Sequence, residues 1–330
     1  MMPEMEFRRA LGLAIEEEME RDPDVFLMGE EVDEYDGAYK VSKGLSQKFD
    51  DKRVVDTPIS EAGFSGLGIG AAMAGLRPII EFMTWSFTPV AFDQLVNNAA
   101  KVRYMSGGEM SIPITFRGPS GVVHQLAATH SHAAEAWFAH VPGLKVVACS
   151  TPRMGKGLLK SAIRDPDPVM FLESELMYGM EDEVPDDSDF TLPLHKANVF
   201  REGSDVTILA YSKRVHQALD AAEELAEEGI EAEVIDLVSL RPLDEETILE
   251  SLRKTNRIVT VEESWSTCGI GASIADIAQR KAFDFLDAEI RRVTLEDVPM
   301  PYNETMENYA QPSPDKVVDA AKETLYVEST

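Results

Sequence analysis

Hydrophobic positions in the first half of the chain alternate between helical and strand spacing. Phe7, Leu11 and Ile15 recur every four residues and predict an N-terminal helix with one apolar face. The short apolar runs 25–28 and 53–55 have the length of buried strands. Further strands are expected at 78–83, 112–116, 144–148 and 169–172, and helices at 60–74, 88–104, 133–140 and 155–163. Repeated βα alternation predicts a parallel sheet covered by helices on both faces.

A second αβ series follows an acidic stretch, 181–189, which contains Pro185 and has no periodicity, so a linker is expected there. The later strands are expected at 206–210, 232–237, 258–262 and 290–293, and the helices at 215–228, 245–254 and 270–283. The pattern therefore predicts an α/β chain of two domains, residues 1–187 and 188–330. Each is expected to be a mainly parallel sheet covered by helices.

Length and charge narrow the class of protein. A chain of 330 residues exceeds one ordinary α/β core, and no run of about 18 apolar residues predicts a membrane span. The 31 basic and 59 acidic residues give a net charge of −28, which repels phosphate backbones and anionic lipid. We therefore expect no nucleic acid and no membrane partner. The acidic residues can form a solvated surface, a docking patch for a basic partner, or both.

The cysteines and the first residues bear on location. Cys149 and Cys268 are far apart and have no metal-binding spacing around them, as is typical of reduced thiols. The acidic start has no apolar signal core. A cytoplasmic location is expected.

The glycine-rich segment 66–71 matches the dinucleotide pattern G-x-G-x-x-A. That site needs its glycines in a tight turn directly after a strand. Here residues 57–65 separate the preceding strand from the glycines, which therefore fall inside the helix that opens at Ser60. They indicate close packing rather than cofactor binding.

Four histidines, His124, His130, His132 and His140, crowd the stretch after a Gly-rich loop. A zinc site needs further ligands at defined spacing, and none stand out. A substrate-facing role for at least one of these histidines is as plausible as a structural one.

Glu61 stands at the mouth of the Gly-rich helix, inside the segment Asp56–Phe64. Compensation of the charge at a helix N-terminus would by itself explain such a residue. The sequence segments around Glu61 give a further reason to single it out from other acids at helix N-termini.

Several short segments, in order and spacing, make the chain resemble the E1 β subunits of 2-oxoacid dehydrogenases along nearly its whole length. These segments are Gly29–Val32, Asp56–Phe64, Glu81–Thr84, Tyr104–Gly108, His130–His132, Pro142–Val147, Lys156–Leu159, Leu176–Gly179 and Asp297–Tyr302. Residues 105–108, 176–179 and 298–302 are more similar to the pyruvate enzymes than to the branched-chain enzymes. The resemblance implies thiamine-diphosphate-dependent oxidative decarboxylation of pyruvate, with acetyl transfer to the lipoyl group of E2.

The resemblance also implies the architecture and the partners. A pyrimidine-binding domain would precede a transketolase C-terminal-like domain, with thiamine diphosphate shared between the α and β chains of an α2β2 heterotetramer. The α chain would hold Mg through a Gly-Asp-Gly motif, which is missing here; the nearest match is Tyr35-Asp36-Gly37. E2 dihydrolipoyl acetyltransferase and its lipoyl domain would be further partners, with E2 docking on acidic surface of the second domain.

Site residues carry over by position. Glu61 matches the glutamate that hydrogen-bonds N1′ of the aminopyrimidine and so promotes loss of the thiazolium C2 proton. Ile59, Met83 and Phe87 match side chains that line the pyrimidine slot. Trp85 and Ser86 depart from the commoner Phe-Asn, which leaves the shape of the pocket open.

His130 matches a family histidine near the thiazolium, and the resemblance implies a role in acyl transfer to the lipoyl arm. A structural potassium ion is also implied, held mainly by backbone carbonyls. Its matching positions are Ile114, Ala162, Ile163, Asp165 and Asp167, where Pro166-Asp167 replaces the more frequent Asn-Asn.

Two alternatives stay open at this point. The chain could serve a branched-chain 2-oxoacid or acetoin enzyme. It could also be a non-catalytic scaffold, against which the intact Glu61, Phe87 and His130 argue.

Overall fold

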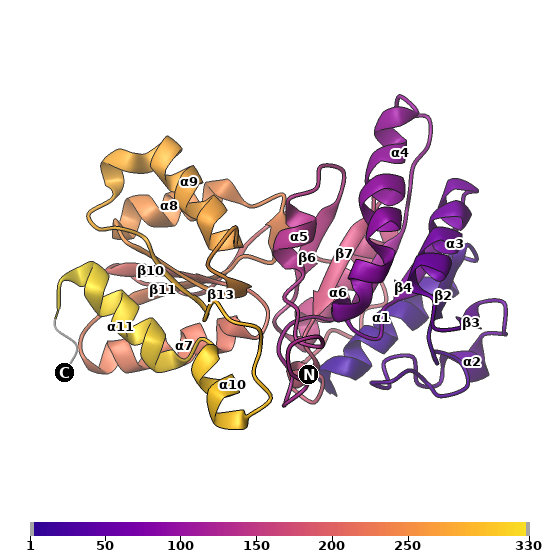
Figure 1. Ribbon diagram of the computed structural model, residues 1–330, viewed down its shortest axis with the longest axis horizontal. Helices are drawn as coiled ribbons and strands as arrows, with labels where there is room; N and C mark the ends of the chain where they lie inside the picture. Colours follow the sequence, from indigo (N-terminus) through magenta and orange to yellow (C-terminus); the bar gives the residue numbers. More distant parts are fainter. Residues whose placement is uncertain (1–2, 328–330) are drawn as a thin grey trace. The chain divides into compact units, whose positions relative to one another are not determined.

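The computed structural model describes residues 3–327 (Figure 1). The chain divides into two compact units. The first contains the residues up to Gly121 together with Trp137–Leu194, and the second contains Val122–Ala136 together with the residues from His195 onward. The expected single division at 187/188 does not anticipate that Val122–Ala136 groups with the second unit.

The first unit is built on a parallel sheet in the order β6-β7-β5-β4-β2-β3. Its strands are β2 (Val25–Gly29), β3 (Val54–Asp56), β4 (Arg77–Glu81), β5 (Thr115–Pro119), β6 (Lys145–Ala148) and β7 (Val169–Glu173). Every residue of β5 and β7 is buried, as expected for central strands with helices on both sides.

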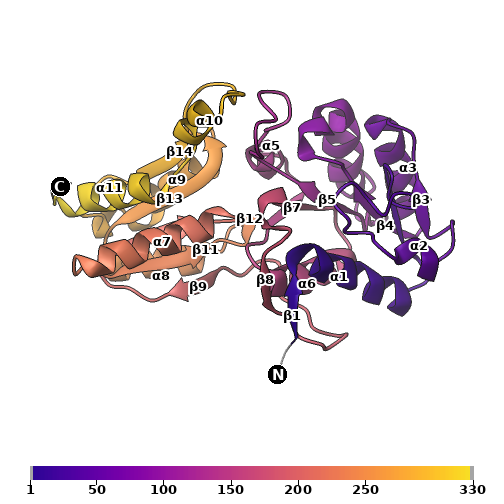
Figure 2. The same ribbon diagram turned by 90° about the horizontal axis from the view of Figure 1, so that it is seen from below.

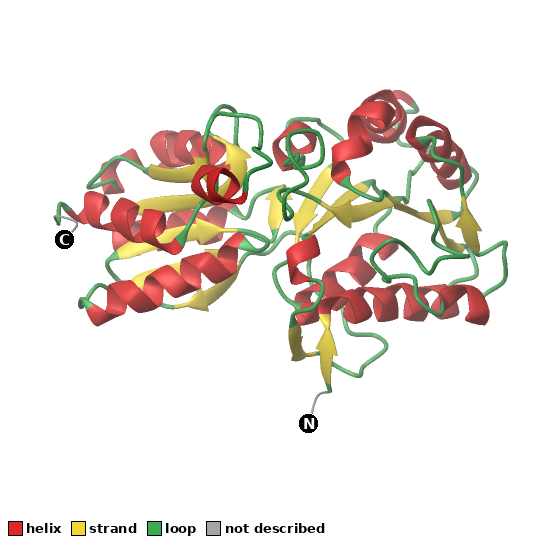
Figure 3. Ribbon diagram, turned by 60° about the horizontal axis from the view of Figure 1, so that its bottom comes forward, coloured by secondary structure: helices red, strands yellow, loops and turns green. Residues whose placement is uncertain are grey.

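The helices of this unit are α1 (Phe7–Arg21), α2 (Leu45–Lys48), α3 (Glu61–Met73), α4 (Ala100–Met105) and α6 (Pro152–Arg164). Helices α1 and α6 pack side by side (Figure 2), where a Cβ on Gly155 would lie 2.6 Å from the Phe7 ring. Figure 3 shows helices on both faces of the sheet, which confirms the predicted layering.

The helix expected at 88–104 is found within one continuous helical stretch, residues 85–105, whose hydrogen-bond pattern changes along its length. It is a 3-10 helix over Trp85–Ala91, a π-helix over Gln94–Ala99 and the α-helix α4 over Ala100–Met105. Pro89 lies in the first of these, where it has no backbone N–H to donate.

The linker expected at 181–189 is wrong, because this stretch is ordered. Strand β8 (Glu181–Glu183) pairs antiparallel with β1 (Glu4–Glu6). The residues after β8 are held by two fully buried ammonium groups: Lys156 donates to the carbonyls of Pro185 and Asp187, and Lys160 to that of Ser188. These contacts come from residues that are far away in the sequence. The acidic stretch therefore shows no helical or strand periodicity of its own.

The second unit contains a sheet in the order β14-β13-β10-β11-β9. Strands β10 (Val206–Ala210), β11 (Ala232–Asp236), β13 (Ile258–Trp265) and β14 (Arg291–Leu295) are parallel, and β9 (Asn198–Arg201) is antiparallel at one edge. The mainly parallel sheet is therefore confirmed in both units.

Helices α7 (Arg214–Glu227), α8 (Glu245–Thr255), α9 (Ile270–Ala282), α10 (Glu304–Ala310) and α11 (Pro314–Leu325) surround this sheet. Helices α10 and α11 are not among the elements expected from the sequence, the last of which is the strand at 290–293. A signal for α11 exists, since Ser313 accepts the Lys316 N–H as N-cap and Pro314 occupies the first turn. Val317, Val318 and Ala321 then join the core beside α7. Among residues 3–327, no helix is long and apolar enough to cross a bilayer.

Candidate functional site

The candidate site lies where the strand order of the first sheet reverses. Strand β2 pairs with β3 on one side and with β4 on the other, so the connections leaving these strands diverge. Ligands of open α/β sheets bind beyond the carboxyl ends of strands at such a switch point. Glu30 directly follows β2, and Glu61 follows β3 after a short loop.

Glu61 opens the first turn of α3 and is only 7% exposed. The helix is held close to the sheet by its glycines: a Cβ on Gly68 would lie 2.6 Å from Cδ1 of Ile80, a residue of β4. Gly66, Gly68 and Gly70 all lie within α3, so the dinucleotide interpretation stays rejected. The small residues thereby set the position of the helix that carries Glu61.

Glu30 is a site residue that the sequence analysis does not single out. Burial, and then the neighbouring carboxylate of Glu61, raise the pKa of Glu30 from its ordinary value of 4.5 to about 7. Its Oε1 is buried and has no hydrogen-bond partner within residues 3–327. In the same part of the chain neither carboxyl forms an ion pair. The sequence signal that could have identified Glu30 is an acidic residue directly after an apolar strand.

The apolar residues expected at the site differ in exposure. Met83 and Phe87, which follow β4, are half-buried, whereas Ile59 is 82% exposed. Trp85 is fully buried: its indole N–H donates to the Gly118 carbonyl at 2.8 Å, and its ring meets Phe138 edge-on. Trp85 therefore belongs to the core of the first unit. Its difference from the commoner Phe of the family affects the packing of that core.

His130 lies on the loop between β5 and α5 (Glu135–Ala139), within the segment that groups with the second unit. Its Nδ1 is 2.9 Å from the Thr129 hydroxyl, and the side chain is half-buried. The Ser131 hydroxyl donates to the Ala127 carbonyl at 2.8 Å. In the described residues no three His, Cys, Asp or Glu side chains are arranged to hold a metal ion.

The residues expected around potassium gather at the end of α6. Ala162 and Ile163 occupy its last turn, where carbonyls point along the negative end of the helix dipole. Ile114 lies on another segment of the same unit, where its carbonyl accepts a hydrogen bond from the Val169 N–H at 3.0 Å. The positions are thus brought together at one end of the sheet.

Their side chains already have cationic partners. The Lys145 ammonium is 2.7 Å from both carboxylate oxygens of Asp165 and 3.3 Å from Asp167, which also pairs with Arg103. The Ile163 carbonyl accepts from Arg77 at 3.1 Å. The Ala162 carbonyl also accepts, from the Asp165 N–H at 3.2 Å, so an ion here would have to use the second lone pairs of carbonyls that already accept a hydrogen bond.

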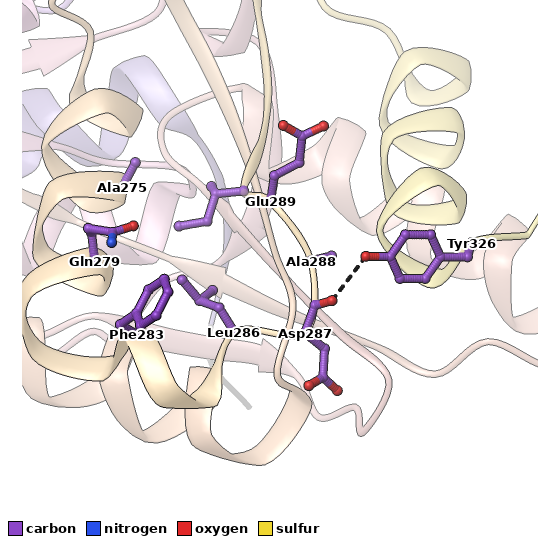
Figure 4. Close-up of a pocket in the computed structure, with 9 residues that line it drawn as sticks. Ala275, Gln279, Phe283, Leu286, Asp287, Ala288, Glu289 and Tyr326 are labelled. Carbon is purple, nitrogen blue, oxygen red and sulfur yellow. Dashed lines mark hydrogen bonds between the residues drawn. The ribbon is translucent and has the colours of Figure 1, made fainter.

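The second unit contains a hollow of about 520 Å³ between α9, residues 286–290 and Tyr326, which caps the end of α11. Figure 4 shows Phe283 and Tyr326 on either side of it, with Asp287 and Glu289 between them. The two aromatic side chains are 60% and 76% exposed. The hollow has both polar and apolar lining, and its two acids have arginine partners, Asp287 with Arg257 at 3.5 Å and Glu289 with Arg291 at 2.7 Å.

Comparison with known proteins defines the class first. The chain matches the transketolase pyrimidine binding domain over residues 3–181 and the transketolase C-terminal domain over residues 195–317. A solved structure described as a split gene transketolase, inactive beta4 tetramer, has the same fold with a TM-score of 0.77. It is 23% identical and covers 98% of this chain and 99% of its own. The protein is therefore transketolase-like in both domains.

Closer relatives define the family. The chain is 55% identical to the mitochondrial pyruvate dehydrogenase E1 component subunit beta-2 of Oryza sativa subsp. japonica, over 98% of this chain and 87% of the relative. It is 53% identical to the E1 subunit beta of Rickettsia felis, over 97% and 98%, and to the mitochondrial subunit of Bos taurus, over 97% and 90%. The chain belongs to the family of pyruvate dehydrogenase E1 component β subunits.

The raised pKa of Glu30 predicts a stability change with pH. The folded protein holds a proton that the unfolded chain releases between pH 4.5 and about 7, so Glu30 should lower the melting temperature progressively across that window. In Glu30→Gln this loss should disappear, and in Glu61→Gln it should shrink because one neighbouring charge is gone. Calorimetry at pH 4.5 and 7.5 measures it, with the exposed Glu31→Gln as control. Equal pH profiles for wild type and Glu30→Gln would contradict the shift.

Proposed function

We propose that this chain is the catalytic β subunit of a pyruvate dehydrogenase E1 component. With an α subunit it would carry out thiamine-diphosphate-dependent oxidative decarboxylation of pyruvate and transfer the acetyl group to the lipoyl group of E2. The observation that supports this most is the pair of buried carboxyls, Glu30 and Glu61, at the switch point of the sheet. Neither is paired with a base in the described residues, in a family named for this activity.

The residues fit the aminopyrimidine of thiamine diphosphate. A carboxyl without a counter-ion can hold a proton at a ring nitrogen, and Glu61 would do so at N1′. Met83, Phe87 and Ile59 would provide the apolar contacts to the ring. When bound, the cofactor supplies the electron sink that takes up the pair released as carbon dioxide leaves.

Glu30 keeps the charge of this site low. With a pKa of about 7 it is largely protonated below neutral pH, so it adds little negative charge beside Glu61 there. Near neutral pH Glu30 can also accept or return a proton, which suits a neighbour of an acid–base group. Glu30 therefore supports the protonation cycle that we assign to Glu61.

We infer that an α chain completes the site. Ile59 is 82% exposed although it belongs to the proposed slot, and Leu67, on the outward face of α3, is 65% exposed. Nothing lies within 4 Å of a Cβ placed on Gly70, on the same face. An exposed apolar and glycine-rich helix face suits close packing by another chain. The α chain would also bring the Mg-diphosphate motif that this sequence lacks, in an α2β2 heterotetramer.

We also propose a potassium ion at the end of α6, held by the carbonyls of Ile114, Ala162 and Ile163 and by backbone of Asp165 and Asp167. The lysine on the two carboxylates does not occupy these carbonyl oxygens. The cytoplasmic location drawn from the reduced cysteines stays a prediction; Cys149 and Cys268 form no disulfide in the described residues.

E2 is proposed to dock on the second unit at the hollow lined by Phe283, Asp287, Glu289 and Tyr326. The chain carries a net charge of −28, and the family resemblance implies a basic subunit-binding domain on E2. The acids would attract that domain, and the hollow would take up an apolar side chain of it.

Glu61→Gln should abolish pyruvate decarboxylation in the reconstituted tetramer while leaving the tetramer assembled. An amide cannot exchange a proton at N1′, and loss of such a partner commonly costs 10²–10⁴-fold in rate, on the order seen for general acid–base groups. Turnover with pyruvate, and competition by a branched-chain 2-oxoacid, are the measurements. Glu31→Gln, an exposed acid of the same unit, is the control and should be active. Near-normal turnover of Glu61→Gln would sink the assignment.

His130→Ala should depress the overall reaction through E2 and largely spare reduction of an artificial electron acceptor. Imidazole has an unperturbed pKa near neutrality, so it can give a proton to the dithiolane sulfur as the lipoyl ring opens. Decarboxylation depends on the cofactor and Glu61. Both activities are measured on one preparation, with His140→Ala, an exposed histidine nearby in the sequence, as control. Equal losses would mean that His130 only orders its loop.

Phe283→Ala should weaken binding of E2 by about tenfold or more, as expected for an aromatic anchor in a hollow. Phe200→Ala, an exposed aromatic on the edge strand of the same unit, should leave affinity unchanged. Affinity of the wild-type tetramer should fall with salt, and the slope should be smaller in Asp287→Asn/Glu289→Gln. Titration calorimetry measures the affinity of both single variants for E2 and the salt dependence of the affinity. If Phe283→Ala binds E2 as tightly as wild type, E2 does not dock at this hollow.

A further inference from the structure

The segment Val122–Ala136 carries His130 and is attached to the second unit at buried points. At its start, the Val122 carbonyl accepts from the Lys213 ammonium at 2.6 Å, and the Val122 N–H donates to the Glu263 carboxylate. Lys213 and Glu263 pair with each other at 2.7 Å, and both are less than a tenth exposed. A buried ion pair thus holds both backbone polar groups of one loop residue, Val122.

A second attachment lies at Gln125, whose backbone N–H donates to both carboxylate oxygens of Glu307, at 3.0 and 3.2 Å. Gln125 has a φ of +51°, a left-handed conformation that costs free energy unless contacts compensate. Glu307, on α10, is 2% exposed. Within residues 3–327 no basic side chain forms an ion pair with it.

The third attachment lies at the end of the segment. The Tyr211 hydroxyl, just beyond β10, donates to Glu135 at 2.8 Å, and both side chains are 3% exposed. Burial raises the pKa of Glu135 to about 7. Between the second and third attachments lie His130 and the two local hydrogen bonds around it, from Ser131 to Ala127 and between Thr129 and His130.

The burial of Glu307 is the informative feature. Removing a carboxyl from water is unfavourable unless hydrogen-bond donors replace the water. Among the described residues the hydrogen bonds to the Glu307 carboxylate both come from the Gln125 N–H, so this carboxyl is tied to one position of the His130 loop. Its place in the first turn of α10 also favours a negative charge at the helix N-terminus.

We propose that Glu307 is a positioning residue for His130, acting together with the Lys213–Glu263 pair and Tyr211. The inference rests on the proposed acyl-transfer role of His130 and assigns what holds that imidazole in place. A reacting group must be kept within a fraction of an ångström of its productive position, and a supporting set of hydrogen bonds on rigid elements does this. Glu307 supplies it from α10, and Lys213 with Glu263 from α7 and β13.

The test uses the reconstituted α2β2 tetramer with E2, in which the artificial-acceptor reaction and the overall reaction are both measured. Glu307→Ala should lower the overall reaction by about ten- to a hundredfold and largely spare acceptor reduction, because only transfer depends on His130. Glu307→Gln should restore most of the activity, since its amide oxygen still accepts the Gln125 N–H. Glu304→Ala, an exposed acid of the same helix, should match wild type. The double variant His130→Ala/Glu307→Ala should be no worse than His130→Ala alone.

Hydrogen exchange separates the two proposals. Amides of residues 125–134 should exchange faster in the Glu307→Ala tetramer than in Glu304→Ala. Unchanged exchange, equal loss of both activities, or additive losses in the double variant would each overturn the positioning role. If His130→Ala lowers both activities equally while Glu307→Ala still speeds exchange, the acyl-transfer role of His130 fails and the attachment by Glu307 stands.

Discussion

Two buried carboxyl groups set the central constraint of the first unit. Glu30 and Glu61 lie close enough for one charge to raise the pKa of the other, and the described residues supply no counter-ion. Such a pair is stable only when it shares fewer than two negative charges or when a ligand donates to it. The strand register explains the pairing, since β2 and β3 run side by side and end together at Gly29 and Asp56. The glycines of α3 then allow the helix that begins with Glu61 to pack closely against the sheet.

The layering and most elements could be predicted from sequence because they follow local periodicity. Strand β10 and helix α3 lie where apolar spacing and the Ser60 boundary put them. The errors arise where distant contacts decide. Backbone pairing with Glu4–Glu6 makes β8 out of an acidic stretch, and the Pro185 and Asp187 carbonyls after it are held by Lys156, 29 and 31 positions away.

The site shows the same limit. Glu61 could be predicted because a family motif surrounds it, whereas the importance of Glu30 depends on burial and on a neighbour 31 positions away in the sequence. The hydrogen bonds that hold the His130 loop could not be predicted from the sequence. Gln125 and Glu307 are 182 positions apart, and Val122 and Lys213 are 91 apart. No periodicity in a single sequence encodes contacts of that range.

A raised pKa does not by itself distinguish a reacting acid from a structural one in this protein. Burial is the first cause of the shift to about 7 for both Glu30 and Glu135. Glu135 accepts a hydrogen bond from Tyr211 and lies on the segment that carries His130. Among the described residues the Oε1 of Glu30 has no hydrogen-bond partner, and Glu30 lies near Glu61 at the carboxyl edge of the sheet. The roles proposed for Glu30 and Glu135 therefore rest on geometry and not on the pKa shift that they share.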